Sequence, residues 1–238
     1  MSFSDPQAVH NTLEDVEIIT FAVAPLGCNC SIVFSRSTGE AVVVDPGGEA
    51  PRIIGHLESH GCRVRWIIHT HAHFDHCLGT HAVASHCSNA HGSADADGQP
   101  VSGVRVALHS GDQELYDKLE MQCRMFGVPQ QKAERAIDHL LQDEECITFG
   151  PNRMTVLHTP GHTPGSCCFA VNEKPIVFSG DTLFAMGIGR TDLWGGDSGA
   201  IMKSIRERLF TLDDGTYVIP GHGPFTRIFE EKQSNPFF

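Results

Sequence analysis

The chain has 238 residues, of which 40% are hydrophobic, so it can bury an ordinary core as one large or two small domains. Its 17 Lys and Arg against 29 Asp and Glu give a net charge of −12, which argues against nucleic acid or an anionic membrane as partner. No apolar run approaches the length of a transmembrane helix, and the N-terminal residues do not resemble a signal peptide. Nine cysteines spread along the chain indicate mostly buried thiols in a reducing compartment, which predicts a cytoplasmic location.

The first half of the chain is predicted to form strands followed by helices. Runs of β-branched and apolar residues predict strands at 16–24, 30–35, 41–45 and 64–70. A hairpin turn at 36–39 joins the second and third strands. Pro51 stands near the start of a helix that ends before Gly61, and a second helix is predicted at 77–84.

The second half is predicted to place a long helical region between strands. Small and polar residues at 88–100 indicate a surface insertion. A strand at 104–109 precedes residues 111–146, which we expect to be largely helical with a break around 127–129. Further strands are expected at 154–159, 167–171, 176–179 and 217–220. Ser198 is the predicted N-cap of a helix whose apolar residues recur every four positions.

Six residues after the fourth predicted strand carry most of the chemistry, in the order His71-Ala72-His73-Phe74-Asp75-His76. A hydrophobic core does not need three imidazoles and a carboxylate, whereas a strand-to-helix turn can aim them at one site. We therefore predict a metal site at this turn. Asp45, at the end of an earlier strand, either organises its own turn or bonds a ligand histidine.

Three later segments repeat this design, because each is an apolar strand followed by a turn bounded by glycine. The complete set of candidate ligands is His71, His73, Asp75, His76, His162, Asp181 and His222. Seven nitrogen and oxygen ligands exceed the needs of one tetrahedral zinc and suit two metals with a bridging carboxylate. Since no cysteine occupies these positions, a thiolate-rich structural zinc site is disfavoured.

The motif resembles that of a known family, the metallo-β-lactamase fold hydrolases. Residues 70–76 match its T-H-x-H-x-D-H signature, and the later ligands fall in the expected order over about residues 16–236. The resemblance implies an α/β fold, an αββα four-layer sandwich of two mixed β-sheets with helices outside, as a single domain over 1–238. It assigns His71, His73 and His162 to one metal, Asp75, His76 and His222 to the other, and Asp181 as the bridge.

Within this family the chain looks most like a short form of the glyoxalase II group. The supporting segments are Cys28-Asn29-Cys30-Ser31-Ile32, residues 44–50, Arg124-Met125-Phe126-Gly127, Gly189-Arg190-Thr191-Asp192 and residues 220–224. This resemblance implies a dinuclear-metal thioester hydrolase acting on S-D-lactoylglutathione or a related small acyl thioester. The expected cofactors are two Zn²⁺, with Fe or Mn as alternatives in either position. A hydroxide bridging the two cations would attack the thioester carbonyl, and Asp75 would bind metal and orient the water.

The substrate contacts are open in the sequence. Arg124 and Phe126 either line the mouth of the site or belong to the core, and Arg190 either lies near the substrate or fixes its loop through Asp192. Full-length glyoxalase II proteins carry a helical C-terminal domain that contacts glutathione, whereas only 16 residues follow His222 here. Recognition of glutathione is therefore the least supported part of the resemblance.

The alternative function is that of a persulfide dioxygenase, which shares the fold and holds one iron by two histidines and one aspartate. In this chain those ligands would be His71, His162 and Asp181. The Pro-Gly-His-Gly-Pro context of His222 favours the hydrolase. The charge of −12 disfavours a ribonuclease of this fold, and β-lactamases of the fold usually carry a cysteine where Asp181 stands. The sequence leaves the oligomeric state open.

Other histidines are expected to have structural roles. Two of them, His69 and His158, lie in predicted strands and should be packed. Another three, His81, His86 and His91, lack the glycine and proline turns of the candidate ligands and are expected at the surface.

Overall fold

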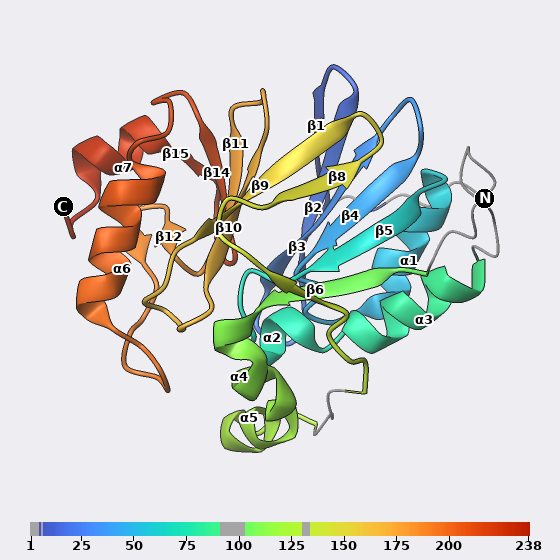
Figure 1. Ribbon diagram of the computed structural model, residues 1–238, viewed down its shortest axis with the longest axis horizontal. Coiled ribbons are helices and arrows are strands. Elements are labelled where there is room, and N and C mark those ends of the chain that lie inside the picture. Colours follow the sequence, from blue (N-terminus) through green and yellow to red (C-terminus); the bar gives the residue numbers. More distant parts are fainter. Residues whose placement is uncertain (1–4, 6, 91–102, 130–133) are drawn as a thin grey trace.

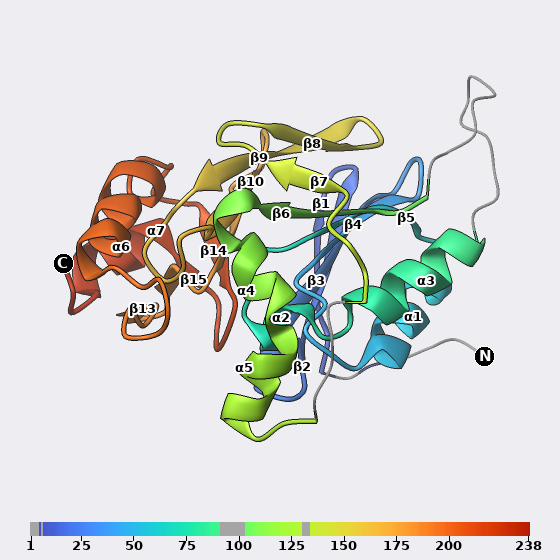
Figure 2. The ribbon, with the colours of Figure 1, turned by 60° about the horizontal axis from the view of Figure 1, so that its bottom comes forward.

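The computed structural model describes residue 5 and residues 7–90, 103–129 and 134–238. Two β-sheets pack face to face, and helices cover the outer face of each (Figure 1). In Figure 2, α1 and α3 lie at one side of the molecule and α6 and α7 at the other. The predicted αββα sandwich of two mixed sheets is therefore confirmed.

Within the described residues, the first sheet has seven strands in the order β1-β2-β3-β4-β5-β6-β7. Neighbours from β1 to β4 are antiparallel and neighbours from β4 to β7 are parallel. The carboxyl ends of β4, β5 and β6 therefore meet at one edge. The strands are β1 (Val9–Leu13), β2 (Val16–Val23), β3 (Cys28–Ser35), β4 (Glu40–Val44), β5 (Arg63–Ile68), β6 (Arg105–His109) and β7 (His139–Leu141).

The second sheet, in the same part of the chain, has the order β15-β14-β11-β10-β9-β8. Its neighbours are antiparallel except for β11 and β14, which are parallel and end at a common edge. The strands are β8 (Cys146–Phe149), β9 (Asn152–His158), β10 (Cys167–Val171), β11 (Ile176–Gly180), β14 (Tyr217–Pro220) and β15 (Thr226–Arg227). A separate hairpin pairs β12 (Leu183–Phe184) with β13 (Gly187–Ile188).

Helices occupy both outer faces and one end of the sandwich. The first sheet is covered by α1 (Ala50–Ser59) and α3 (Thr80–Ala90). The second is covered by α6 (Ser198–Ser204), the π-helical turn η2 (Ile205–Leu209) and α7 (Ile228–Ser234). At the end lie α2 (Phe74–Cys77), η1 (Ser110–Asp112), α4 (Gln113–Asp117) and α5 (Leu119–Phe126). No described helix is long and apolar enough to span a bilayer.

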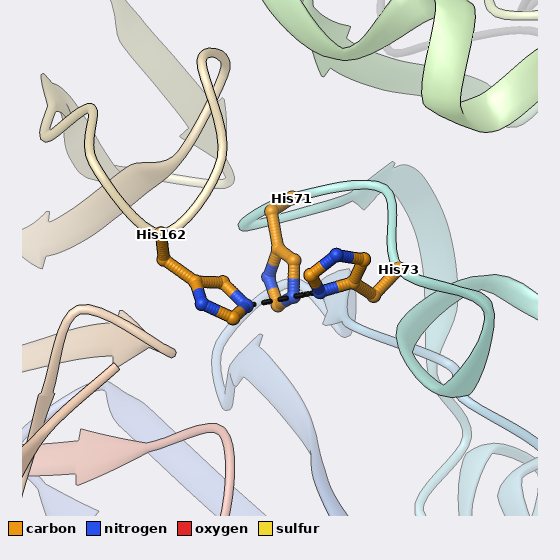
Figure 3. A group of neighbouring side chains, drawn as sticks. All are labelled: His71, His73 and His162. Atoms are coloured by element: carbon orange, nitrogen blue, oxygen red, sulfur yellow. Dashed lines mark hydrogen bonds between the residues drawn. The ribbon is translucent and has the colours of Figure 1, made fainter. Parts of the chain in front are cut away.

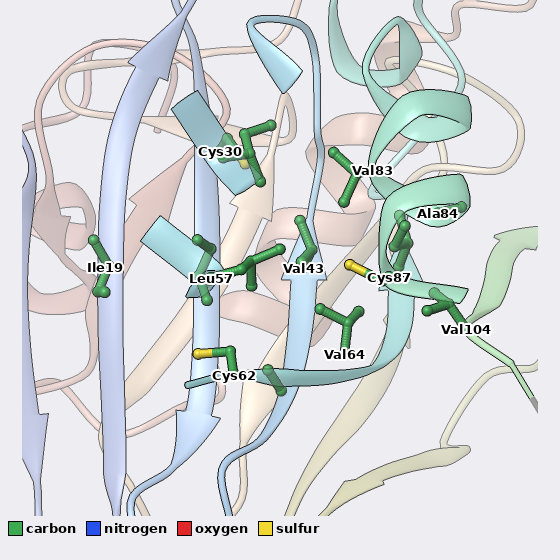
Figure 4. Packing of buried hydrophobic residues seen from close by; sticks show 14 of the residues in the cluster. Ile19, Cys30, Val43, Leu57, Cys62, Val64, Val83, Ala84, Cys87 and Val104 are labelled. Carbon is green, nitrogen blue, oxygen red and sulfur yellow. The ribbon is translucent and has the colours of Figure 1, made fainter. Parts of the chain in front are cut away.

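The central strands are apolar on both faces because both faces are buried. Along β3, Ile32 belongs to the cluster under α1 and α3, whereas the next residue, Val33, belongs to the cluster between the sheets. Figure 4 shows the outer cluster, in which Leu57 of α1 and Val83 of α3 face strand residues such as Val43. The alternation fixes the register of the strands and so the position of the turns that follow them.

Several element predictions were wrong. Residues 139–141 and 146–149 are short edge strands, not part of a largely helical 111–146, because strands this short show no clear period. The first strand, β1, and the last helix, α7, were not predicted. The N-cap of α6 is Asp197, whose side chain accepts from Ala200 N at 2.9 Å, so Ser198 is the first helical residue.

The predicted insertion at 88–100 was wrong at its start, because residues 88–90 form the last turn of α3. The rest of it, from residue 91 onward, lies outside the described residues. Cysteine usage agrees with the prediction of buried thiols, since eight of the nine cysteines are buried and Cys146 alone is exposed.

Candidate metal centre

The turn that follows β5 is held by the carboxylate of Asp45, which comes directly after β4. One oxygen of Asp45 accepts from Thr70 N at 2.8 Å, and the other accepts from Thr70 Oγ1 at 2.6 Å. That second oxygen also lies 3.0 Å from His76 Nδ1. Asp45 therefore contacts a candidate ligand histidine, as one of its two interpretations predicted, and the turn that its side chain organises is the one after β5 and not its own.

The side chains of Asp112 and Gln122 also hold the turn that follows β5. Asp112 accepts from Ala72 N at 3.0 Å, and it also accepts from Thr163 Oγ1 at 2.7 Å and Gly165 N at 2.6 Å. Its carboxylate thus ties the turn at 71–76 to the turn that carries His162. Sequence reasoning missed Asp112, although a polar residue beyond the end of a parallel strand was a usable signal.

Gln122, on α5, brackets His73 by bonding the peptide groups on both sides of it. Its Oε1 accepts from Phe74 N at 3.0 Å, and its Nε2 donates to the carbonyl of Ala72 at 3.0 Å. Sequence reasoning also missed Gln122, because a single glutamine within a helix gives no signal of such a role. Together, Asp112 and Gln122 fix the backbone on which His71 and His73 are mounted.

Three imidazoles converge on one point between these turns (Figure 3). His73 Nδ1 lies 3.1 Å from His71 Nε2 and 2.9 Å from His162 Nε2. His162 comes from the turn after β9, so two segments far apart in sequence supply the group. All three ligand atoms lie within 4.8 Å of one another.

The remote nitrogens of these rings decide which nitrogen carries the proton. His162 Nδ1 lies 2.7 Å from the carbonyl of Arg190, which can only accept, so Nδ1 is the N–H donor. Thr70 Oγ1 donates to Asp45 and lies 3.1 Å from His71 Nδ1, so it accepts from that nitrogen. The Nε2 lone pairs of His71 and His162 therefore both face the centre, as metal coordination requires.

A second group of candidate ligands lies beside the first. His222 Nε2 is 3.1 Å from Asp75 Oδ2 and 3.3 Å from His76 Nε2. His76 Nδ1 faces the carboxylate of Asp45 at 3.0 Å and donates to it, so Nε2 is the nitrogen that faces this second group.

Asp181, directly after β11, lies between the two groups. Its Oδ1 is 3.5 Å from His76 Nε2, and its Oδ2 is 3.6 Å from His162 Nε2 and 3.8 Å from His222 Nε2. The Oδ1 atom is buried, yet it accepts no hydrogen bond from any described residue. A Cβ at Gly221 would stand 2.2 Å from that oxygen, so glycine is needed for the turn to pass this close.

Comparison with known proteins gives the family. The sequence profile of the metallo-beta-lactamase superfamily matches residues 23–222. The chain belongs to this superfamily.

Similar proteins match along nearly their whole length. Hydroxyacylglutathione hydrolase GloC of Haemophilus influenzae is 34% identical over 94% of this chain and 97% of that protein. The crystal structure of BLEG-1 B3 metallo-beta-lactamase has a TM-score of 0.80 at 34% identity and covers 92% of this chain and 98% of that one. That of TTHA1623 in a di-iron-bound form has a TM-score of 0.75 at 33% identity and covers 91% and 98%.

The protonation of the first ligand group and of Asp75 suits the divalent cations that this superfamily implies. Burial and the neighbouring imidazoles lower the pKa of His71 well below its usual value and that of His73 to about 3. Burial alone would raise the pKa of Asp75, but His76 and His222 lower it to about 2. Neutral imidazoles and ionised carboxylates are the forms that bind metal. In the second group, burial opposes the charged form of the imidazoles, but neighbouring acidic groups raise the pKa of His222 and raise that of His76 well above its usual value, so a cation bound there would displace protons.

The predicted ligands are thus brought together, and their donor atoms fit divalent metals. The ring nitrogens of His71, His73 and His162 that face inward have too few N–H groups among them for each lone pair to accept a hydrogen bond. Asp181 Oδ1 also accepts no hydrogen bond from the described residues. Imidazole nitrogen and carboxylate oxygen are the ligands that zinc and iron accept in hydrolytic and oxidative sites.

The three predicted substrate residues differ in how their contacts relate them to this centre. Phe126 is 44% exposed, and its ring centroid lies 5.1 Å from that of Phe74. Arg124 is exposed with its guanidinium 3.9 Å from Glu120. The guanidinium of Arg190 forms two hydrogen bonds with Asp192, at 2.7 and 2.8 Å, while its carbonyl holds His162. Arg190 therefore fixes its loop and also adjoins the candidate centre.

The remaining histidines lie where the sequence placed them, as far as they are described. His69 is fully buried against Cys77 and Thr80. His158 is half-buried and stacks on His109 at 4.0 Å between ring centroids. His81 and His86 are at the surface, beside Glu134 and Glu58. His91 lies outside the described residues.

Proposed function

We propose that this superfamily member is a dinuclear-metal thioester hydrolase that acts on S-D-lactoylglutathione or a related small acyl thioester. The observation that supports it most is the pair of adjacent ligand groups with Asp181 between them. A site for one metal would leave Asp75, His76 and His222 without a role.

The residues would divide between two cations. His71, His73 and His162 would hold one, Asp75, His76 and His222 the other, and Asp181 would contact both. Two divalent cations bound there would supply a water molecule of lowered pKa and an electrophile for the thioester carbonyl. Zn²⁺ is the expected metal, and Fe or Mn suits the same nitrogen and oxygen ligands.

The side chains contribute orientation and charge. Asp75 stays ionised because its pKa is about 2, so it can accept a hydrogen bond from the attacking water while it holds metal. His71 and His162 keep their lone pairs inward because their other nitrogens donate to Thr70 and Arg190. The departing thiolate needs little help from a protein acid, since a thiol has a pKa of about 8.5.

The relatives support a compact thioesterase. GloC of Haemophilus influenzae, a protein named hydroxyacylglutathione hydrolase, is matched over 97% of its own length. Nearly the whole of a protein named hydroxyacylglutathione hydrolase therefore aligns with this chain. We propose that Phe126, Arg124 and Arg190 line the approach for the thiol carrier, since Phe126 packs on Phe74, Arg124 is exposed two residues before Phe126 on α5, and Arg190 adjoins His162.

Hydrolysis of a panel of thioesters, with metal content measured on the same sample, tests this function. We expect turnover of S-D-lactoylglutathione or another small acyl thioester, and its loss in His222→Ala. The exposed and unrelated substitution His81→Ala should keep turnover and metal content. A β-lactam arm is included because BLEG-1 is named a B3 metallo-beta-lactamase. Preferential β-lactam turnover would overturn the proposal.

An iron-dependent persulfide dioxygenase is the second candidate, because the two histidines and one aspartate that hold its single iron have counterparts here, and TTHA1623, crystallised in a di-iron-bound form, shows that a similar protein binds iron. It would use His71, His162 and Asp181 as iron ligands. His162 Nε2 lies 3.6 Å from Asp181 Oδ2. Oxygen consumption with glutathione persulfide by a protein holding one iron would favour it. The second ligand group argues for the hydrolase.

A further inference from the structure

A separate group of metal-binding side chains lies outside the candidate centre. His10 of β1, Glu17 of β2 and His60, which caps the C-terminus of α1, each offer one ligand atom. These three atoms lie within 4.8 Å of one another. His10 is exposed, and Glu17 and His60 are half-buried, so solvent can reach the group.

The register of the first two strands explains why these residues meet. His10 pairs with Ile19 and Thr12 pairs with Glu17, so His10 and Glu17 are diagonal neighbours on one face of the sheet. Ile19 on that face is buried in the cluster that contains Ile53 and Leu57 of α1. The helix therefore crosses this face, and its C-terminal residue His60 arrives beside the two strand residues.

Local contacts prepare these side chains for a cation. His60 Nδ1 lies 2.9 Å from the carbonyl of His56, so it carries the proton and Nε2 keeps its lone pair. A ligand histidine in metal sites commonly has its other nitrogen held in this way. Glu17 Oε1 lies 4.0 Å from His10 Nδ1, and the negative end of the α1 dipole also favours positive charge.

We propose that His10, Glu17 and His60 form an additional binding site for a borderline divalent cation such as Zn²⁺, Ni²⁺ or Cu²⁺. Two imidazoles and one carboxylate are a ligand set that zinc uses, with water completing the tetrahedron. Zinc ligands at about 2.0–2.1 Å from the metal lie roughly 3.3 Å apart, so the side chains close by about an ångström on binding. His10, which is exposed, can make that adjustment by changing rotamer.

The site is remote from the candidate centre and independent of the proposed function. The N-terminal end of α1 adjoins the centre. Gly47, just before this helix, packs so closely on Asp75 that a Cβ there would stand 1.8 Å from the Asp75 carbonyl oxygen. His60 is at the other end of this helix, about 15 Å away. A cation there would link edge strand β1 to α1 and would stabilise the edge of the first sheet.

Counting bound zinc on matched variants tests the site. Metal-free wild type, His10→Ala/His60→Ala and the control His81→Ala/His86→Ala are dialysed against the same low concentration of Zn²⁺, and bound zinc is measured by mass spectrometry. We expect the first variant to bind one equivalent less than wild type and the control to bind as much as wild type. The difference between proteins is the readout, so it does not depend on how many ions the candidate centre holds.

Glu17→Gln provides a second test that keeps the size of the side chain. It should weaken zinc binding at this site at least tenfold and reduce the rise in Tm that Zn²⁺ produces. Equal zinc content in wild type and His10→Ala/His60→Ala, or an equal loss in the control, would overturn the proposal.

Discussion

At the scale of single residues, the candidate centre depends on which nitrogen of each imidazole is protonated. His71, His76 and His162 each have one nitrogen held by Thr70, Asp45 or Arg190, which leaves the other as a ligand. The sequence showed that histidines were present and offered Asp45 as a partner for one of them, but it did not show that Thr70 and the carbonyl of Arg190 orient the others. That information comes from residues 1 to 31 positions away and, for His162, from a backbone carbonyl that any residue could supply.

Asp75→Asn tests the residue that the proposed mechanism uses both as a metal ligand and to orient the attacking water. The change keeps the size of the side chain but removes the charge, so we expect thioester turnover to fall about 10²–10⁴-fold. Turnover and metal content are measured on the same preparation. Near-normal turnover at near-normal metal content would show that Asp75 has no such role.

Gly221→Ala tests the close approach to Asp181. The new Cβ would stand 2.2 Å from Asp181 Oδ1 and 2.8 Å from His76 Cε1, so one ligand must move. We expect loss of metal and a destabilisation of about 1–3 kcal/mol by urea denaturation. Gly215→Ala is the matched control, because its Cβ would meet no atom within 4 Å. Equal metal binding by Gly221→Ala and wild type would contradict this prediction.

At the scale of elements, the centre is built from turns that follow strand ends. The turns after β5, β9, β11 and β14 supply the ligands, and those after β4 and β6 supply Asp45 and Asp112. The sequence could predict the four ligand turns because each combines an apolar strand with glycine and a metal-binding residue. It could not predict that Asp112 would join two of them, because that contact spans 51 positions.

Asp112→Asn tests this junction between turns. Three N–H or O–H groups point at its two oxygens, so an amide NH₂ would face at least one donor and leave it unsatisfied. We expect metal affinity at His71, His73 and His162 to fall about 10–100-fold while the fold persists. Competition with a chelator measures this affinity. Asp117→Asn, at an exposed residue of α4, is the control and should behave as wild type. Equal metal affinities in the two variants would refute the role of Asp112.

At the scale of the whole molecule, the sequence predicted the central strands of the two sheets better than the strands at the sheet edges. Central strands such as β3 and β4 are buried over most of their length and rich in apolar and β-branched residues, which identifies them. The edge strands β1, β7 and β8 are short or exposed, and α7 has only seven residues, most of them polar, so their local patterns are weak. Tertiary pairing, not local propensity, decides these elements.

The buried histidines predict how the stability of the metal-free protein depends on pH. Burial lowers the pKa of His69 to about 4 and that of His73 to about 3, whereas both have a pKa of 6.5 when unfolded. The unfolded chain therefore binds more protons below pH 6.5, and each residue removes up to about 1.4 kcal/mol of stability per pH unit. The urea midpoint in the presence of a chelator should fall between pH 7 and pH 5. A midpoint that is constant or rises would contradict these pKa directions.

Reconstitution of metal-free protein tests the central claim most directly. Zn²⁺ is added in increasing amounts, and hydrolysis of S-D-lactoylglutathione and other small acyl thioesters is measured with metal content on each sample. We expect no hydrolysis without metal, and turnover that follows occupancy of both ligand groups and is lost in His162→Ala and in His222→Ala. A fully loaded protein that hydrolyses none of these thioesters would contradict the claim.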